Sequence, residues 1–463
     1  MKGRKVGMTR RKVLQLGTAA AAGAAFGPFF HTLGHGQTFN WQRFKGKELY
    51  LILYKHPFVD EMVKHIPEFE SLTGIKAKYE VLPEVQGRQK FTVEMTAGSG
   101  GVDAWHASMH VEKRRAWKSG WFQPLNNFLE DKSLTAPDYD WNDFTQGARN
   151  DVTQPDKTIS ALPTFVDPFV LFYRKDLYQQ KGLQAMKTWE DFINIAKTLN
   201  NPPHMYGCII PSAETGASTI LLETAFMTNN VHWFEYHTGK KEYELALDKG
   251  ENKKRAVETL EFLNELHKYS PEASTYNWAE LMSTFVAEKA ANSYYVGARL
   301  LEQVMANNAR IADTTAPVAF PKRLTNHYMV SIQGFHILNQ SNVDGAKQYV
   351  KFFLKHPDCI QWYHAVPLHI IPASREVLRS AKYQNHPVIQ KRMDVLHFLD
   401  SIWGKGVPLY YWDGKEMNPY IGLYHNENLG GWMVAMRNIK RDKSEAIIDE
   451  AANKIRSKMK RVG

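Results

Sequence analysis

Residues 162–197, LPTFVDPFVLFYRKDLYQQKGLQAMKTWEDFINIAK, contain the pattern that decides the fold. The first third is apolar and rich in β-branched and aromatic residues, which predicts a buried strand over 165–173. Gly182 is expected to end a short helical turn after that strand. Thr188 then predicts the N-cap of an amphipathic helix, with two acidic residues near the positive helix end. One face of that helix carries Phe192, Ile195, Ala196 and Leu199.

The order of these side chains, LP…LFYRKDL…GL…TWEDF…AK, resembles the central region of extracellular solute-binding proteins of the sugar-binding type. These are maltose-binding-protein-like periplasmic receptors that feed ABC importers. The resemblance continues downstream in family order through the segments 285–297 (FVAEKAANSYYVG), 346–354 (AKQYVKFFL) and 371–375 (IPASR). It implies a protein without catalytic activity that captures a sugar or oligosaccharide.

The resemblance also implies the architecture: two discontinuous α/β lobes, joined by a three-segment hinge, with a ligand cleft between them. The chain would cross between the lobes near Val166, Val330 and Ala373. Loops that leave the carboxyl ends of strands would line the cleft. The expected bounds are 47–165 and 334–372 for lobe one, 168–329 and 375–463 for lobe two, and 1–40 for a signal segment.

Length and charge limit the alternatives. At 463 residues the chain is long enough for two cores, and its formal net charge is +10. Six bases and no acid fall in residues 1–40, which leaves 52 Lys and Arg against 48 Asp and Glu in the remainder. Such a small excess, without a basic run beyond the N-terminus, argues against a nucleic-acid partner.

The N-terminus predicts export. The segment Thr9–Leu14 (TRRKVL) is a twin-arginine box, and an Ala-rich apolar run follows over 13–30. A membrane anchor is the alternative, but the run is interrupted by glycine and proline and lies below the ~20 apolar residues that a spanning helix needs. No cysteine follows the run, which excludes a lipoprotein. The expected location is therefore the periplasm.

Twin-arginine export carries folded proteins, which raises the alternative of a periplasmic enzyme acting on carbohydrate. The chain offers little for cofactor chemistry, because Cys208 and Cys359 are its only cysteines and are far apart. It contains no HExxH, GxSxG or P-loop motif. The His232/His237 and His364/His369 sets lack an obvious carboxylate partner. We therefore expect no cofactor and no metal site.

A sugar site needs aromatic faces together with groups that donate and accept hydrogen bonds. Loops at the positions where the resemblance places ligand contacts carry such residues. The family's usual Trp is missing before Gly297, where Tyr294 and Tyr295 stand instead, so stacking at that subsite is in doubt. The candidate ligand-binding residues are His56, Ser108, His110, Asp167, Glu214, Thr215, Tyr294, Tyr295, Gln333 and Trp432.

Several of these residues have structural alternatives. His56 and His110 would then cap the helices that follow them, and Asp167 would brace the hinge by pairing with Arg174 or Lys175. Tyr294 and Trp432 would be core residues.

The function has alternatives as well. A glycerol phosphate or another polar solute would want clustered cations, for which Arg299 is the one candidate. Asp167 and Glu214 could suggest a glycosidase, although an acid on each lobe of a hinged binder is equally expected. The expected partners are the ligand and the permease subunits of an importer, and the protein is expected to be a monomer.

Overall fold

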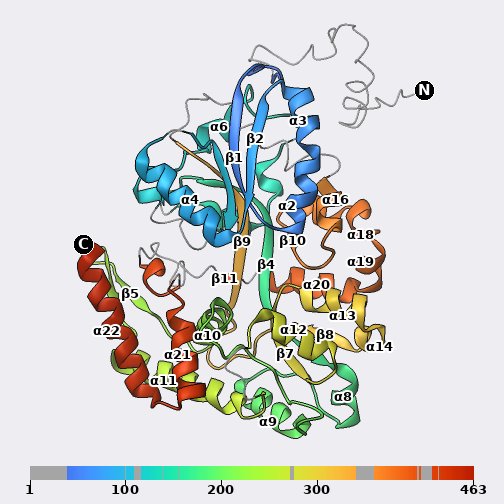
Figure 1. Ribbon diagram of the computed structural model, residues 1–463, viewed down its shortest axis with the longest axis vertical. Helices are drawn as coiled ribbons and strands as arrows, with labels where there is room; N and C mark the ends of the chain where they lie inside the picture. Colours follow the sequence, from blue (N-terminus) through green and yellow to red (C-terminus); the bar gives the residue numbers. More distant parts are fainter. Residues whose placement is uncertain are drawn as a thin grey trace.

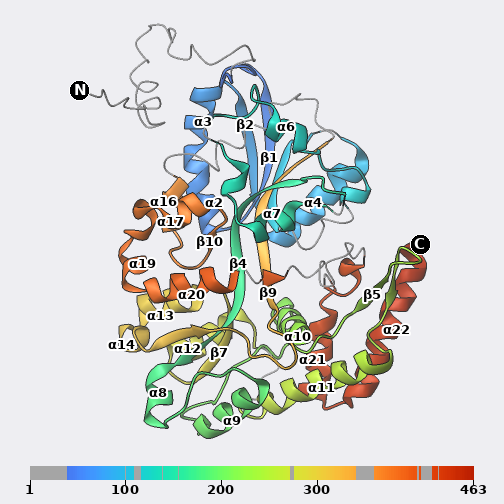
Figure 2. The ribbon, with the colours of Figure 1, turned by 180° about the vertical axis from the view of Figure 1, so that it is seen from behind.

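The computed structural model describes most of the chain after the predicted signal segment. The described residues are 39–99, 101–108, 116–137, 139–154, 156–271, 276–339, 359–403, 406–407, 420–425 and 427–462. Figure 1 shows two bodies, one above the other, between which the long strands β4 and β9 run, and the reverse view in Figure 2 agrees. We call the body with β1, β2 and β3 lobe one, and the body with β7 and β8 lobe two.

The principal sheet follows the strand order β10-β4-β9-β3-β1-β2, with β11 on β9 and with β7 and β8 on β4. The β1–β2 and β1–β3 pairs are parallel, whereas β9 is antiparallel to both β3 and β4. The hairpin β5–β6 is separate. The strands are β1 (Glu48–Tyr54), β2 (Lys76–Leu82), β3 (Ala104–Ser108), β4 (Ala161–Arg174), β5 (Phe234–His237), β6 (Glu242–Leu245), β7 (Asn292–Val296), β8 (Thr315–Val318), β9 (Tyr328–Ile337), β10 (Ile371–Pro372) and β11 (Gly406–Val407).

Helices cover both faces of the sheet in lobe one and surround the core of lobe two (Figures 1 and 2). The helices up to β4 are α2 (Pro57–Met62), η1 (Val63–His65), α3 (Ile66–Thr73), α4 (Glu84–Ala97), α6 (Asn126–Glu130), η2 (Trp141–Asp143) and α7 (Gln146–Val152). Those between β4 and β9 are α8 (Lys175–Gln180), α9 (Trp189–Leu199), α10 (Gly216–Thr228), α11 (Gly250–His267), α12 (Trp278–Val286), α13 (Arg299–Asn307) and α14 (Ala309–Ala312). Those after β9 are α16 (Cys359–His364), α17 (Arg375–Arg379), α18 (Ala381–Gln384), α19 (Pro387–Lys391), α20 (Met393–Trp403), η5 (Ile421–Leu423), α21 (Leu429–Ala435), η6 (Met436–Lys440) and α22 (Ser444–Val462).

Strand β4 links the lobes by exchanging its partners along its length. Up to Pro168 it pairs with β9, and from Phe169 onward it pairs with β7 and then also with β8. The short strand β10 joins it at Val166. These exchanges fall where the sequence placed the crossovers, while the lobe bounds themselves stay a prediction.

Proline and glycine explain the irregular start of β4. The register with β9 shifts between Pro163 and Phe165, because a proline cannot donate to the ladder. Opposite this point, a Cβ on Gly334 would lie 2.5 Å from the carbonyl oxygen of Leu162. Only glycine therefore allows the two strands to approach so closely here.

The helix predicted at Thr188 begins as expected. Thr188 accepts a hydrogen bond from the Asp191 N–H at 3.2 Å, and the Asp191 carboxylate accepts in return from the Thr188 N–H at 2.9 Å. This is a capping box, which satisfies two donors at the helix start. Its apolar face is buried in the lobe-two core, where Trp189 stacks on Phe262 with ring centroids 4.0 Å apart.

Two segments differ from the sequence prediction. The largely apolar run over 205–210 (MYGCII) predicts a strand, but it makes only isolated bridges, at Met205, Tyr206 and Ile209. The backbone donors of this segment bond to different parts of lobe two: the N–H groups of Tyr206, Cys208 and Ile209 donate to the carbonyls of Lys289, Tyr269 and Asn292, so no continuous ladder forms. The polar composition of 238–250 predicts an insert without regular structure, but the segment contains strand β6, whose Tyr243 and Leu245 are buried, an alternation present in the sequence.

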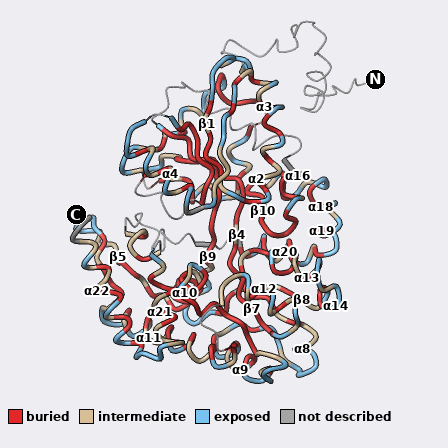
Figure 3. Tube along the Cα trace, in the orientation of Figure 1, coloured by how far each residue is buried: buried red, intermediate tan, exposed pale blue. Residues whose placement is uncertain are grey.

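Buried residues follow the central strands, and exposed residues follow the outer helices (Figure 3). Within the described residues, no helix has the combination of length and apolarity that crossing a bilayer requires. The predicted signal segment lies outside these residues, except for Phe39 and Asn40, and so does the helix expected over 346–354.

Candidate ligand-binding site

Three of the expected residues lie close together on adjacent strands. Ser108 is the last residue of β3 and stands opposite Gln333 on β9. Gln333 in turn stands opposite Phe165 on β4, and Asp167 follows two residues later, opposite Ser331. The fold therefore brings Ser108, Gln333 and Asp167 to one end of the lobe-one sheet.

His56 follows β1 and caps the next helix. Its Nδ1 accepts the Phe58 N–H at 3.2 Å, which confirms the capping alternative. The imidazole is 7% exposed and packs against the ring of Phe165 at 5.3 Å. Burial, assisted by the positive charge of Arg299, lowers its pKa from 6.5 to about 4. The ring is therefore neutral at pH 7, and since Nδ1 accepts, Nε2 carries the proton.

Two residues outside the set of candidate sugar-binding residues also lie near His56: His369, and Arg299, which the sequence offered only as a candidate cation. The ring of His369 lies 5.1 Å from that of His56, and burial lowers the pKa of His369 well below its ordinary value. Arg299 is the first residue of α13 and is exposed. Its charge lowers the pKa of both imidazoles, so it lies close to them. The available signal for His369 was its position three residues before Pro372, at the expected third crossover.

A close backbone approach holds His369 in place. A Cβ on Gly297 would lie 2.1 Å from the His369 carbonyl oxygen, and Gly297 has a φ of +53°. The next residue, Ala298, donates its N–H to the carbonyl of Leu368 at 3.1 Å. The turn between β7 and α13 is therefore locked onto the loop before β10, and this contact fixes where α13 begins.

A third buried imidazole, that of His106, lies on β3. His106 on β3 is fully buried and makes a 3.1 Å hydrogen bond from Nε2 to the hydroxyl of Thr164. That hydroxyl donates to the carbonyl of Gln333 at 2.9 Å, so it accepts from His106. Burial lowers the pKa of His106 to about 3. The site is therefore built on neutral polar groups and not on charged imidazoles.

Two charged residues lie at the site, Arg88 and Asp167. Arg88 on α4 donates to the Ser108 hydroxyl at 2.9 Å. Asp167 is half-buried. The proposed hinge brace from Arg174 is wrong, because its guanidinium pairs instead with Asp176 at 2.8 Å and Glu288 at 3.3 Å.

Two of the predicted ligand-binding residues of lobe two, Glu214 and Thr215, lie directly before α10. Glu214 is exposed, and Thr215 is the N-cap residue of that helix without a side-chain capping bond. The Thr215 hydroxyl oxygen is buried and makes no hydrogen bond, as is also true of the side-chain oxygen of Gln333. Both oxygens can accept from a ligand hydroxyl.

Two predicted residues are core residues. Tyr294 is 0% exposed, its hydroxyl lies 2.7 Å from that of Thr224, and its ring packs against Trp278 and Phe320. Tyr295 is 1% exposed and donates to the Trp278 carbonyl at 3.1 Å. Because their rings are enclosed by lobe-two side chains, the structure corrects their assignment as stacking platforms.

Trp432 also departs from the expected role. It lies on α21, packs against the lobe-two core and is covered by the ammonium of Lys454, 3.2 Å from the ring centroid. This is a cation–π contact with α22, which occupies a ring face that a sugar would use. His110 lies outside the described residues. Within the described residues, no cluster of three or more His, Cys, Asp or Glu is arranged to hold a metal ion.

Comparison with known proteins decides the family. Residues 56–358, well over half of the chain, match the model of the bacterial extracellular solute-binding protein family. The chain belongs to this family. Its members bind solutes and are not enzymes.

Curated relatives of the family bind polyols. An erythritol/L-threitol-binding protein of Mycolicibacterium smegmatis is 26% identical over 207 residues, which cover 42% of each chain. A mannitol-binding protein of Pseudomonas aeruginosa is 27% identical over 266 residues, or 56% of each chain. The chain spans about half the length of the curated relatives it matches.

Solved structures establish the fold over a longer span. A ribitol complex of a solute-binding protein from Agrobacterium radiobacter K84 has a TM-score of 0.71 at 18% identity, covering 89% of this chain and 99% of that one. The maltose-bound MalE3 of T. maritima has a TM-score of 0.69 at 16% identity, over the same shares. The fold is therefore the mixed α/β fold of periplasmic binding proteins, as the sequence predicted.

Proposed function

We propose that this protein captures a neutral, hydroxyl-rich solute, a sugar or a polyol, between its two lobes and delivers it to an ABC importer. The names of the relatives support the ligand class, since they include binders of erythritol, mannitol and ribitol. Closure of the lobes about β4, β9 and the segment at β10 would trap the solute, and the importer would recognise the closed form.

The observation that carries this proposal is the character of the polar groups at the lobe-one sheet end. His56 offers a neutral Nε2–H donor, while the side-chain oxygen of Gln333 is a buried acceptor without a hydrogen bond. A hydroxyl both donates and accepts, so one class of ligand satisfies both groups. A buried acceptor left without a partner costs free energy, which favours a ligand that supplies a donor.

The position of the aromatic residues favours a small ligand. The expected platforms Tyr294, Tyr295 and Trp432 are engaged within lobe two. Long oligosaccharides need several exposed aromatic faces, whereas a polyol or monosaccharide is held mainly by hydrogen bonds. We therefore infer a ligand of one sugar unit or an acyclic polyol of similar size.

One observation favours a second ligand class. Arg299 is exposed beside His56 and His369, where it could pair with an anionic oxygen of a glycerol phosphate. A binding panel should therefore contain both classes.

Isothermal titration of the exported form with mannitol, ribitol, erythritol, maltose and glycerol 3-phosphate tests the proposal. We expect one neutral polyol or sugar to bind at one site per chain, with the bound compound recovered unchanged. A Gln333→Leu variant should lose about one hydrogen bond, or up to about tenfold in affinity. Binding of glycerol 3-phosphate alone, or chemical conversion of a sugar, would contradict the neutral-solute proposal.

Export is a separate part of the proposal. We infer passage through the twin-arginine pathway to the periplasm, on the basis of Arg10 and Arg11. Replacing both with lysine should leave precursor in the cytoplasm, and normal periplasmic accumulation would exclude this route. The protein would act as a monomer on the permease subunits, which size-exclusion chromatography with light scattering checks.

A further inference from the structure

A cavity of about 870 Å³ lies on lobe two, apart from the site described above. This open cavity is lined by the chain after α9, by the end of α11 and by η6, and Figures 1 and 2 place α9 and α11 at the end of the molecule away from lobe one. Its described lining contains no residue of the candidate sugar site. Its polar lining includes Asn264, His267, Lys268, Arg437, Asn438 and Arg441.

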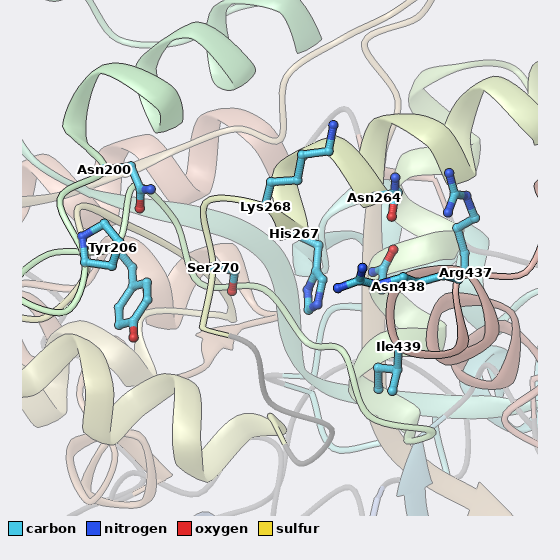
Figure 4. A pocket seen from close by; sticks show the side chains of 11 residues that line it. Asn200, Tyr206, Asn264, His267, Lys268, Ser270, Arg437, Asn438 and Ile439 are labelled. Atoms are coloured by element: carbon cyan, nitrogen blue, oxygen red, sulfur yellow. The ribbon is translucent and has the colours of Figure 1, made fainter.

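Asn438 is the residue that this cavity leaves unexplained. Its side chain is 6% exposed, yet neither its amide nitrogen nor its amide oxygen makes a hydrogen bond. Buried amides are almost always satisfied, and each exception calls for an explanation. Figure 4 shows Asn438 beside His267 and Asn264, with side chains that converge from η6 and α11.

The backbone at Asn438 is also unusual. Residues Met436–Lys440 form a π-helix, and Arg441 ends it with a φ of +62°. A π-helical turn is less stable than the α-helix that would replace it, and such turns occur frequently at functional sites. Here the π-helical turn carries Asn438, which lines the cavity. A regular α-helical continuation of α21 would change the direction of this side chain.

Among the described residues, the cavity is lined by cations and by no carboxylate. Lys268, Arg437 and Arg441 contribute their side chains to the lining. Arg437 is held by Glu261 through Nε at 3.0 Å and Nη2 at 2.7 Å, which leaves Nη1 uncommitted to that pair. Lys268 is held by Glu265 at 2.5 Å through one of its three N–H donors. Each of these two cations therefore pairs with a glutamate of α11 and keeps further N–H donors.

These groups define the chemistry of a ligand. Cationic donors favour an anionic oxygen, as in a phosphate or carboxylate. The amide oxygen of Asn438 needs a donor, which a bare phosphate dianion does not have and a hydroxyl does. The volume lies within the range of small-molecule pockets.

We propose that this lobe-two cavity is a second binding site, for a small hydroxylated anion of the class of sugar phosphates and sugar acids. Asn438 bonds a ligand hydroxyl through both of its amide atoms, and Arg437 and Lys268 bind the anionic group. The inference is independent of which solute binds between the lobes.

Isothermal titration of the full exported chain with glucose 6-phosphate and with gluconate tests this site and separates its two possible ligand sources. Glucose has the hydroxyls but no anionic group, and inorganic phosphate has the anionic group but no sugar hydroxyl. Each should therefore bind at least about tenfold more weakly than the better of the two probes. The Asn438→Leu variant should weaken binding of the better probe by about tenfold or more. Its apo melting temperature should stay equal or rise, because an apolar side chain of similar shape removes an unsatisfied amide.

Two further variants keep the test decisive. Lys268→Met should also weaken binding of the anionic probe, whereas Asp167→Ala should leave it unchanged, since Asp167 belongs to the other site. The proposal is overturned if neither anion binds, if inorganic phosphate binds as tightly as glucose 6-phosphate, or if Asn438→Leu leaves the affinity unchanged. If Asn438→Leu does not fold, Asn438→Ser replaces it with the same expected loss of affinity.

Discussion

Replacing His56 with asparagine should make the protein markedly more resistant to acid. The folded state lowers the pKa of His56 from 6.5 to about 4, chiefly by burial. Between these values the unfolded chain binds a proton that the folded chain does not, so stability falls as the pH drops through 6.5 and stops falling below about 4. At about 1.4 kcal/mol per pKa unit, His56 alone removes about 3 kcal/mol between pH 7 and pH 4.

Asparagine suits this test because it does not titrate and is a good N-cap for α2. The free energy of unfolding, measured by urea denaturation from pH 7 to pH 4, should fall by about 3 kcal/mol less in His56→Asn than in the parent. His204→Asn, at an exposed histidine, is the matched control and should retain the parental slope. If His56→Asn also keeps that slope, His56 is not held neutral in the folded state.

Four other outcomes follow from the structure. Gly297→Ala should destabilise the protein by several kcal/mol, because the new Cβ would lie 2.1 Å from the His369 carbonyl oxygen, and a thermal melt equal to the parent would disprove that contact. Tyr294→Phe should cost about 1 kcal/mol through its lost bond to α10 without changing ligand affinity, whereas a tenfold affinity loss would restore the residue to the ligand site. Asp167→Ala should weaken solute binding by about 10- to 150-fold if its carboxylate bonds a ligand hydroxyl, and unchanged affinity in calorimetric titration would reject that role. A tight ligand should reduce the radius of gyration in solution scattering, and superimposable profiles with and without ligand would contradict closure.

Local patterns were sufficient to predict most of the elements. The run over 165–173 became β4, and the Thr188 cap began α9 one residue later, because the signals for both lie within a few residues of chain. Signals of this kind need no knowledge of the tertiary fold.

The site was less predictable, because burial depends on residues far away in the sequence. Tyr294 and Tyr295 carry the composition of a sugar platform, and only the packing of α10 and α12 shows that their rings are enclosed. His369 carried only a positional signal, its place before the expected third crossover, since its role depends on a contact with Gly297 across the chain. Residue type indicated which groups can bind a sugar, but not which of them face it.

The electrostatics of His56 connect the two lobes. His56 belongs to lobe one and Arg299 to lobe two, yet the arginine charge contributes to the lowered pKa of the imidazole. A Coulomb interaction weakens as its charges separate, and more steeply once water enters between them. Opening the lobes would therefore raise the pKa of His56 toward its ordinary value to the extent that it moves Arg299 away from the imidazole. By linkage, the neutral imidazole favours the arrangement in which the lobes face each other, and protonation favours their separation. A bound solute that accepts a hydrogen bond from Nε2–H would also favour the closed arrangement of the lobes. The reason is that this hydrogen bond forms only while both lobes surround the solute.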